Sequence, residues 1–220
     1  MKVLVIGATG GSGRAVVAEL LGRGHSVTAF SRHASELRVD ASGDLRTIDG
    51  DATDSSAVEA AVRGHDAVVL TLGISENAMR VRLFGPAHTA ADVRSRGTRN
   101  VVAAMKRSGS TRLVVQSTYG VGETAAKLGL VDRIFFAVLI KQQAADHTKQ
   151  ESIVRASGLD WTIVQPMHLT DDPAADREFV STTGEIGSRK VSRRAVGRVL
   201  ADASTSSDYL GTSIAVSASS

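Results

Sequence analysis

The chain has 220 residues, of which 42% are hydrophobic and 22% charged, and its formal net charge is +3. This length fits one globular domain with a sizeable core, and the modest charge predicts no nucleic-acid-binding surface. Because cysteine is absent and the six histidines form no HxxxH or HExxH pair, disulfides, a thiolate nucleophile and metal sites of these types are excluded.

Short apolar runs alternate with longer segments of helical periodicity along the chain. The runs predicted to form strands are Val3–Ile6, Ser26–Phe30, Leu45–Ile48, Ala67–Leu72, Arg112–Gln116, Trp161–Val164 and Ser213–Val216. The segments predicted to form helices are Gly13–Gly22, Ser55–Val62, Ala90–Ser108, Gln142–Ala156 and Ser192–Ala203. Strands that are short and rich in Val, Ile and Leu are typical of a parallel sheet covered by helices on both faces.

This alternation predicts an α/β fold, a single Rossmann-type doubly wound parallel sheet over residues 1–220. A small substrate-binding portion is expected at about 118–185. Asp54 and Ser192 precede predicted helices and are expected to be their N-caps. Helix C-caps are expected at three glycines that stand just before the next strand, Gly22, Gly64 and Gly158.

The first predicted strand ends in a turn crowded with glycine, Gly7-Ala8-Thr9-Gly10-Gly11-Ser12-Gly13, after which a helix begins. At the carboxyl edge of a parallel sheet, the N-terminus of such a helix attracts anions, and glycine lets a pyrophosphate approach the main chain. The pattern therefore predicts a dinucleotide site whose cofactor-binding residues here are Gly7, Thr9, Gly10, Gly11, Ser12 and Gly13.

The residues after the second predicted strand indicate which dinucleotide binds. Ser31 and Arg32 stand where an NAD-selective site usually carries a carboxylate. A hydroxyl beside a planar guanidinium suits the 2′-phosphate of NADP, so we predict NADP(H) as the preferred cofactor. The next two strand ends are expected to complete the site with Asp51, near the adenine amino group, and with Ala52, Leu72 and Gly73.

Several blocks carry a family resemblance, namely Gly7-Ala8-Thr9-Gly10, Ser31-Arg32, Gly50-Asp51-Ala52, Gly97-Thr98-Arg99-Asn100-Val101-Val102-Ala103-Ala104-Met105-Lys106, Ser157-Gly158-Leu159-Asp160-Trp161-Thr162 and Pro166-Met167-His168-Leu169. Together they resemble the atypical short-chain dehydrogenase/reductases, and within these the NAD(P)H-binding, NmrA-like branch that includes flavin reductases of the biliverdin reductase B type. The chain departs from that pattern at Glu36, where the flavin reductases carry a second basic residue.

The resemblance implies an NADPH-dependent oxidoreductase that passes hydride to a flavin or another planar acceptor, quinone- or tetrapyrrole-like, in an open pocket. FMN or FAD is then a substrate rather than a bound cofactor. By position, Thr118, with Ser117 beside it, matches the family's hydroxyl residue near the nicotinamide, and His147 matches a histidine on the pocket's helix. The segment that borders the nicotinamide and the acceptor is matched by Pro166, Met167, His168 and Leu169.

Carbonyl-reducing members of the superfamily use a Tyr-x-x-x-Lys pair. It is missing here, because the residues four places after Tyr119 and Tyr209 are Glu123 and Ser213. Flavin reduction mainly requires two flat rings to be positioned face to face. The candidate catalytic residues are Thr118, Ser117, His168 and Tyr119, where His168 either positions the acceptor or is structural.

Two other functions stay open at this point. One is a non-catalytic NADP(H)-binding redox sensor, and the other is a tailoring reductase of a secondary metabolite with Tyr119 or Thr118 as proton donor. His147 is expected to be an exposed polar residue on its helix.

The remaining features indicate a small-molecule acceptor as the partner. Six arginines at near-helical spacing are interpreted as solvated helix faces, Arg94, Arg96, Arg99, Arg193, Arg194 and Arg198. The longest apolar segment, Leu128–Ile140, is too short to span a bilayer and is expected to pack as core. We therefore expect a cytoplasmic protein, a monomer or weak homodimer, with no membrane or nucleic-acid partner.

Overall fold

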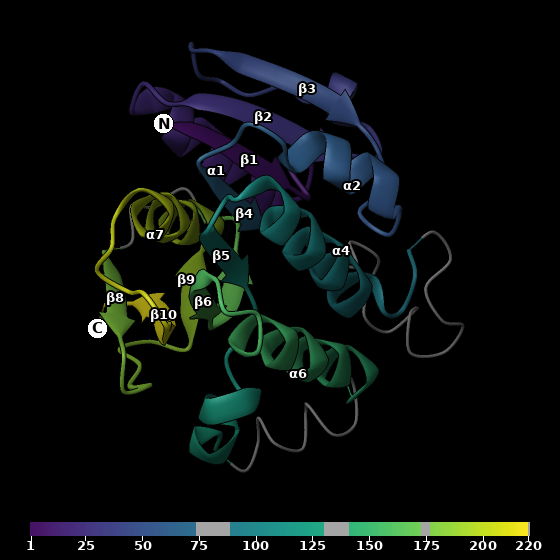
Figure 1. Ribbon diagram of the computed structural model, residues 1–220. Helices are drawn as coiled ribbons and strands as arrows, with labels where there is room; N and C mark the ends of the chain where they lie inside the picture. Colours follow the sequence, from purple (N-terminus) through teal and green to yellow (C-terminus); the bar gives the residue numbers. More distant parts are fainter. Residues whose placement is uncertain (74–88, 130–140, 173–176, 220) are drawn as a thin grey trace.

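A central parallel sheet organises the computed structural model, which describes residues 1–73, 89–129, 141–172 and 177–219 (Figure 1). Its strands follow the order β3-β2-β1-β4-β5-β6-β10-β8. Their bounds are β1 Lys2–Ile6, β2 Ser26–Ser31, β3 Leu45–Asp49, β4 Ala67–Leu70, β5 Arg112–Gln116, β6 Asp160–Pro166, β8 Glu178–Ser181 and β10 Thr212–Ala218. All neighbours pair in parallel except β8, which runs antiparallel to β10. From β1 the next strands are added toward one edge of the sheet, and from β4 they are added toward the other edge. Doubly wound sheets bind ligands at this point between β1 and β4, where the strand order reverses.

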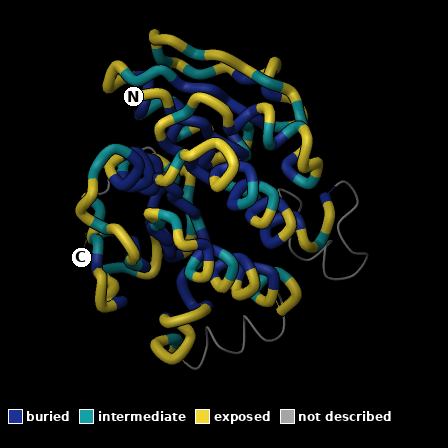
Figure 2. Tube along the Cα trace, in the orientation of Figure 1, coloured by how far each residue is buried: buried dark blue, intermediate teal, exposed yellow. Residues whose placement is uncertain are grey.

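Helices cover both faces of this sheet (Figure 1). One face carries α1 (Gly11–Gly22) and α7 (Arg193–Thr205), and the other carries α2 (Ser55–Val62), α4 (Val93–Ser108) and α6 (Lys141–Arg155). Successive side chains of β1 point to opposite faces: Val3 and Val5 pack with α1 and α7, whereas Leu4 and Ile6 pack with α2 and α4. The central strands of the sheet are buried, whereas its edge strands β3 and β8 and the outer surfaces of the helices are partly exposed (Figure 2).

The predicted α/β fold is confirmed, and all seven predicted strands and five predicted helices are present. Asp54 and Ser192 are N-caps, since their side chains accept hydrogen bonds from backbone N–H groups of the first helical turns. The prediction for Gly22 was wrong: α1 continues through it to the C-cap residue Arg23, and Gly24 adopts the left-handed conformation, with φ +79°. Strand β4 ends at Leu70, two residues earlier than predicted.

Short elements near the C-terminus had no clear sequence signal. Strands β7 (His168–Thr170) and β9 (Lys190–Ser192) form a separate two-stranded parallel sheet, and β8 extends the edge of the main one. Two 3₁₀ helices, η1 (Ala34–Glu36) and η2 (Gly122–Lys127), lie in loops. Leu128 packs against the core as expected, while the rest of its apolar segment, from residue 130 on, lies outside the described residues.

Helices α1 and α7 approach closely because α7 has a glycine at their contact. A Cβ at Gly197 would lie 2.8 Å from the backbone carbon and Cβ of Ala15. One turn earlier on each helix, the aliphatic part of Arg193 lies over Gly11. The packing of these two helices therefore determines where the Arg193 side chain lies relative to the glycine turn.

Replacement of Gly197 by Val is expected to destabilise the fold by about 1–3 kcal/mol, because the added methyl groups force α1 and α7 apart. Urea unfolding followed by circular dichroism measures this. Gly22→Ala is the matched control, since nothing lies within 4 Å of a Cβ placed there; it should be neutral or gain up to about 1 kcal/mol. Equal stability of Gly197→Val and wild type would contradict this account of the helix contact.

Candidate functional site

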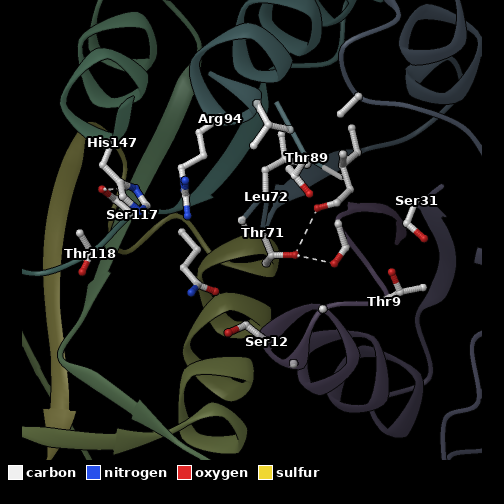
Figure 3. Close-up of a pocket in the computed structure, with 18 of the residues that line it drawn as sticks. Thr9, Ser12, Ser31, Thr71, Leu72, Thr89, Arg94, Ser117, Thr118 and His147 are labelled. Carbon is white, nitrogen blue, oxygen red and sulfur yellow. Dashed lines mark hydrogen bonds between the residues drawn. The ribbon is translucent and has the colours of Figure 1, made fainter. Parts of the chain in front are cut away.

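One cavity of about 880 Å³ runs along the carboxyl edge of the sheet (Figure 3). It starts at the turn between β1 and α1, passes the ends of β2 and β4, and reaches the loops after β5 and β6. The cavity brings together every predicted site residue except Gly13. Its volume is near the upper end of the usual range for ligand pockets.

The glycines of the first turn have different tasks. Gly7 has φ +88°, and a Cβ there would lie 2.7 Å from the Thr71 carbonyl oxygen. A Cβ at Gly13 would lie 2.2 Å from the Gly7 carbonyl oxygen. Both glycines therefore allow close backbone packing, and Gly13 does so without lining the cavity. Gly10 is different, because a Cβ there would come no closer than 3.4 Å to another atom, the Gly7 carbonyl oxygen. The space in front of Gly10 belongs to the cavity.

The N-terminus of α1 is suited to an anion. The first helical hydrogen bond runs from the Arg14 N–H to the Gly10 carbonyl, so the N–H groups of Gly11, Ser12 and Gly13 lie ahead of it. The first turn contains no acidic residue. These amides and the helix dipole favour negative charge at this point.

Arg193 adds a cation beside the turn. The prediction of a solvated helix face was wrong for this residue, since its side chain packs on Gly11 and lines the cavity. Its Nη1 lies 2.6 Å from an Asp171 carboxylate oxygen. Sequence spacing alone did not reveal this, because only the contact between α1 and α7 brings Arg193 to the turn.

At the end of β2, Ser31 and Arg32 face the cavity as predicted. The buried Ser31 Oγ has no hydrogen-bond partner among the described residues. Arg32 is exposed, and its Nη2 donates a hydrogen bond of 3.3 Å to the Thr89 Oγ1. An unpartnered hydroxyl next to a guanidinium fits the phosphorylated ribose of NADP.

Asp51 and Ala52 lie at the carboxyl end of β3. The Asp51 Oδ1 accepts hydrogen bonds from the backbone N–H of Thr53, at 2.8 Å, and from its hydroxyl, at 2.9 Å. The Ala52 carbonyl accepts a 2.9 Å bond from the Asn100 side chain of α4. These bonds fix the loop that forms the wall beside β2.

Leu72 and Gly73 follow β4 and line the cavity as predicted. Helix α4 presses on this wall because it has a glycine there. A Cβ at Gly97 would lie 2.5 Å from the Leu72 Cδ1. A larger side chain at this point would displace Leu72 toward the cavity.

The far end of the cavity is built from the loops after β5 and β6. The Ser117 N–H donates to the Val164 carbonyl at 2.8 Å, and the Tyr119 N–H donates to the Pro166 carbonyl at 2.9 Å. These bonds hold Ser117 and Thr118 beside the segment of Pro166, Met167, His168 and Leu169, and all of these residues line the cavity. Met167 is buried and His168 exposed, so the segment offers an apolar surface with one polar side chain at its edge.

Tyr119 anchors the loop that follows β5. Its ring is buried, and its hydroxyl donates a 3.0 Å hydrogen bond to the Gly184 carbonyl, which is not part of the cavity wall. Burial, and then the carboxylate of Glu185, raise the pKa of the Tyr119 phenol. A hydroxyl so directed and so weakly acidic is poorly placed to give a proton to a ligand in the cavity.

His147 is buried, so the expectation of an exposed residue was wrong. It lies on the inner face of α6, one turn after Gln143, and both line the cavity. Its Nδ1 lies 3.4 Å from the Ser117 Oγ. Burial, and then the positive charge of Arg94, hold the pKa of His147 well below its usual value, so the ring is neutral at pH 7.

Arg94 is also buried rather than part of a solvated helix face, which corrects the sequence interpretation. Its side chain reaches from α4 into the space between Leu72 and the pair of Ser117 and His147 (Figure 3). Two other arginines of that group that also lie on α4, Arg96 and Arg99, are exposed as expected. The spacing of apolar residues could not single out Arg94, because the first two turns of α4 bury several polar side chains, those of Arg94, Ser95 and Thr98.

Two kinds of site are not found in the described part of the chain. There, no group of three or more His, Asp or Glu side chains is arranged to hold a metal ion. No helix in the described ranges is long and apolar enough to cross a membrane.

Comparison with known proteins fits this geometry. Residues 7–207 match the NAD(P)H-binding domain family. The chain belongs to the NAD(P)H-binding family. The resemblance to short-chain dehydrogenase/reductases of this kind is thereby confirmed, and the glycine turn lies at the start of the matched region and lines the cavity.

Relatives in the family carry several names. A chloroplastic protein of Arabidopsis thaliana is 28% identical over 206 residues, which are 92% of this chain and 71% of that protein. A 2-alkyl-3-oxoalkanoate reductase of Stenotrophomonas maltophilia is 39% identical over 126 residues, 57% of this chain and 36% of the reductase. The chain thus spans only about a third of the length of that reductase.

Solved structures share the fold. An anaerobilin reductase from Escherichia coli O157:H7 has a TM-score of 0.76 at 22% identity, with 99% of this chain and 97% of that one covered. A short-chain dehydrogenase/reductase from Veillonella parvula, in complex with NADP, has a TM-score of 0.77 at 19% identity, with 98% and 94% covered. At these identities the likeness shows the fold alone.

The two kinds of glycine in the turn are expected to respond differently to alanine. Gly10→Ala should leave the fold intact but weaken NADPH binding at least tenfold, about 1.4 kcal/mol, because the methyl group occupies the space before the amides. Gly13→Ala should lower the free energy of unfolding by about 1–3 kcal/mol through its overlap with the turn. Thermal unfolding and NADPH fluorescence titration measure both. A Gly10→Ala protein that binds NADPH like wild type would contradict the assignment.

Proposed function

We propose that the protein is an NADPH-dependent reductase that transfers hydride to a planar acceptor such as a flavin, a quinone or a tetrapyrrole. The observation that carries this proposal is that one continuous cavity runs from the glycine turn to a second, partly apolar end. A dinucleotide that lies with its pyrophosphate at α1 would extend its nicotinamide to that end.

The preference for the phosphorylated cofactor rests on the end of β2. Ser31 Oγ is a buried hydroxyl without a partner among the described residues, and the Arg32 guanidinium beside it supplies the positive charge. Among the described residues that line this end of the cavity, the carboxylate belongs to Asp51, which lies at the end of β3 and not at the end of β2. Glu36, the departure from the flavin-reductase pattern, does not line the cavity.

When bound, the cofactor supplies the hydride, and the protein's task is to orient the acceptor over the nicotinamide. Met167 and Leu169 offer apolar surface for a flat ring, and Thr118 lines the same cavity. The Thr118 Oγ1 makes only a long bond, 3.4 Å, to the Tyr119 carbonyl, so it can turn to donate to an acceptor. His168 stands at the rim of the same wall, where a side chain can position the acceptor.

The other two functions fit the cavity less well. A redox sensor needs the nucleotide end alone, yet the polar and apolar groups of the far end line the same cavity. A tailoring reductase that uses Tyr119 as proton donor would need its hydroxyl in the cavity, whereas it binds the Gly184 carbonyl. The relative named as an oxoalkanoate reductase and the structural neighbour named as an anaerobilin reductase support reduction in general. A cytoplasmic location and a monomeric or weakly dimeric state remain predictions.

Arg32→Ala is expected to erode the preference for NADPH over NADH by about 1.5–3 kcal/mol, the value of a charge-assisted hydrogen bond. NADH affinity should hardly change, because NADH has no 2′-phosphate. Fluorescence titration with both cofactors measures the difference. Arg46→Ala is the matched control, since this exposed arginine of β3 carries the same charge and lies outside the cavity wall. Equal affinity of the wild type for both cofactors would overturn the NADP(H) assignment.

The reductase activity is tested by NADPH oxidation, followed by absorbance, with FMN or with 2-methyl-1,4-naphthoquinone as acceptor. We expect turnover that depends on the acceptor, prefers NADPH to NADH and falls at least tenfold in the Gly10→Ala variant. That variant also serves as the control for contaminating activity. Tight NADPH binding without oxidation by any of these acceptors would favour the sensor instead.

A further inference from the structure

The Arg94 guanidinium is buried with unused hydrogen-bonding capacity. Only 7% of its side chain is exposed, and its Nε and Nη1 have no hydrogen-bond acceptor among the described residues. Buried polar groups nearly always have partners, and a buried charge needs them most. Burial lowers the pKa of Arg94, but a guanidinium stays protonated in proteins. The Arg94 guanidinium is therefore charged, and its Nε and Nη1 lack hydrogen-bond acceptors among the described residues.

The nearby Asp146 forms an ion pair with the Arg94 guanidinium but accepts no hydrogen bond from its Nε or Nη1. Its carboxylate lies 4.0 Å from the Arg94 Nη1, which is beyond hydrogen-bonding distance. Both of its oxygens are used elsewhere, since Oδ2 accepts from the Arg94 backbone N–H at 3.1 Å and Oδ1 from the Ser95 N–H at 3.2 Å. Asp146 thus binds the backbone N–H groups at the N-terminus of α4. The guanidinium N–H groups can still donate hydrogen bonds to another anion.

The position of Arg94 indicates which ligand group it meets. Its Nη2 lies 3.6 Å from where a Cβ of Gly73 would be, and the side chain forms part of the cavity wall next to Ser117 and His147. This is the far end of the cavity, across from the turn where the helix N-terminus and Arg193 are suited to the pyrophosphate. The neutral His147 ring beside it adds no competing charge.

We propose that Arg94 binds the carboxylate of an anionic acceptor at the far end of the cavity, so that the enzyme's substrates are planar molecules with an acidic group. A planar guanidinium matches a carboxylate with two parallel hydrogen bonds. The proposal rests on the proposed function, because it assumes that an acceptor binds beside the nicotinamide. It extends that function by naming the chemical group that the acceptor carries.

Binding of small aromatic probes to the protein saturated with NADP⁺ tests this without requiring turnover. Isothermal titration calorimetry compares 2-naphthoate with 2-naphthamide, which has the same ring but no charge. In the wild type, 2-naphthoate should bind at least tenfold more tightly. Arg94→Gln should remove that advantage and leave NADPH affinity within twofold of wild type. Arg96→Gln, an exposed arginine on the same helix, should change neither value.

Arg94→Lys keeps the positive charge but loses the planar guanidinium. It is the variant to measure if Arg94→Gln fails to fold. It should bind 2-naphthoate several-fold more weakly than the wild type, yet more tightly than it binds 2-naphthamide. Equal binding of both probes by the wild type would overturn the proposal. So would a loss of NADPH affinity in either variant as large as the loss of 2-naphthoate affinity, since Arg94 would then serve the cofactor. A protein that binds 2-naphthoate through Arg94 but oxidises no NADPH would refute the reductase function and leave this site standing.

Discussion

The close backbone packing of the first glycine turn is the constraint on which the rest of the site depends. The Thr71 hydroxyl lies 3.2 Å from both the Ile6 and the Gly7 carbonyl oxygens, which ties the end of β4 to the end of β1. On the inner side, Gly13 leaves no room for a Cβ against Gly7. A turn held this tightly presents the amides of α1 in one direction, and the cavity begins there. Side chains decide little at this end, because backbone groups and helix geometry provide the attraction for a phosphate.

The opposite end of the cavity is built by different physics. There the wall consists of buried polar side chains, Ser117, His147 and Arg94, which are delivered by three separate elements. Each costs free energy to bury, and each constrains its neighbours: burial, and then the Arg94 charge, lower the pKa of His147 and keep its ring neutral, and Ser117 lies within reach of that ring. In the proposed function these side chains select the acceptor, whereas the glycine turn lies in the region that matches the NAD(P)H-binding family.

The loop anchored by Tyr119 separates this protein from reductases that use a tyrosine as acid. Its hydroxyl fastens the loop after β5 to Gly184, in the segment between β8 and β9. The tyrosine therefore holds the loop at the far end of the cavity, and its hydroxyl is directed to the Gly184 carbonyl. A reaction that needs only orientation of two rings is compatible with such a wall, because solvent can supply the proton. The small β7–β9 sheet, which starts at His168, frames the same end.

Local sequence determined the fold, because hydrophobic periodicity, helix caps and the glycine turn are encoded by neighbouring residues. It also predicted which strand ends line one cavity, since the carboxyl ends of parallel strands must meet at one edge. It did not place Arg193, Arg94 or His147, whose sequence surroundings are those of ordinary surface helices. Tertiary structure decided these: the contact of Gly197 with Ala15 brings Arg193 over Gly11, and the packing of α4 on α6 turns Arg94 and His147 inward. Burial of a charged side chain depends on which helices meet, and that information is spread over residues far apart in the chain.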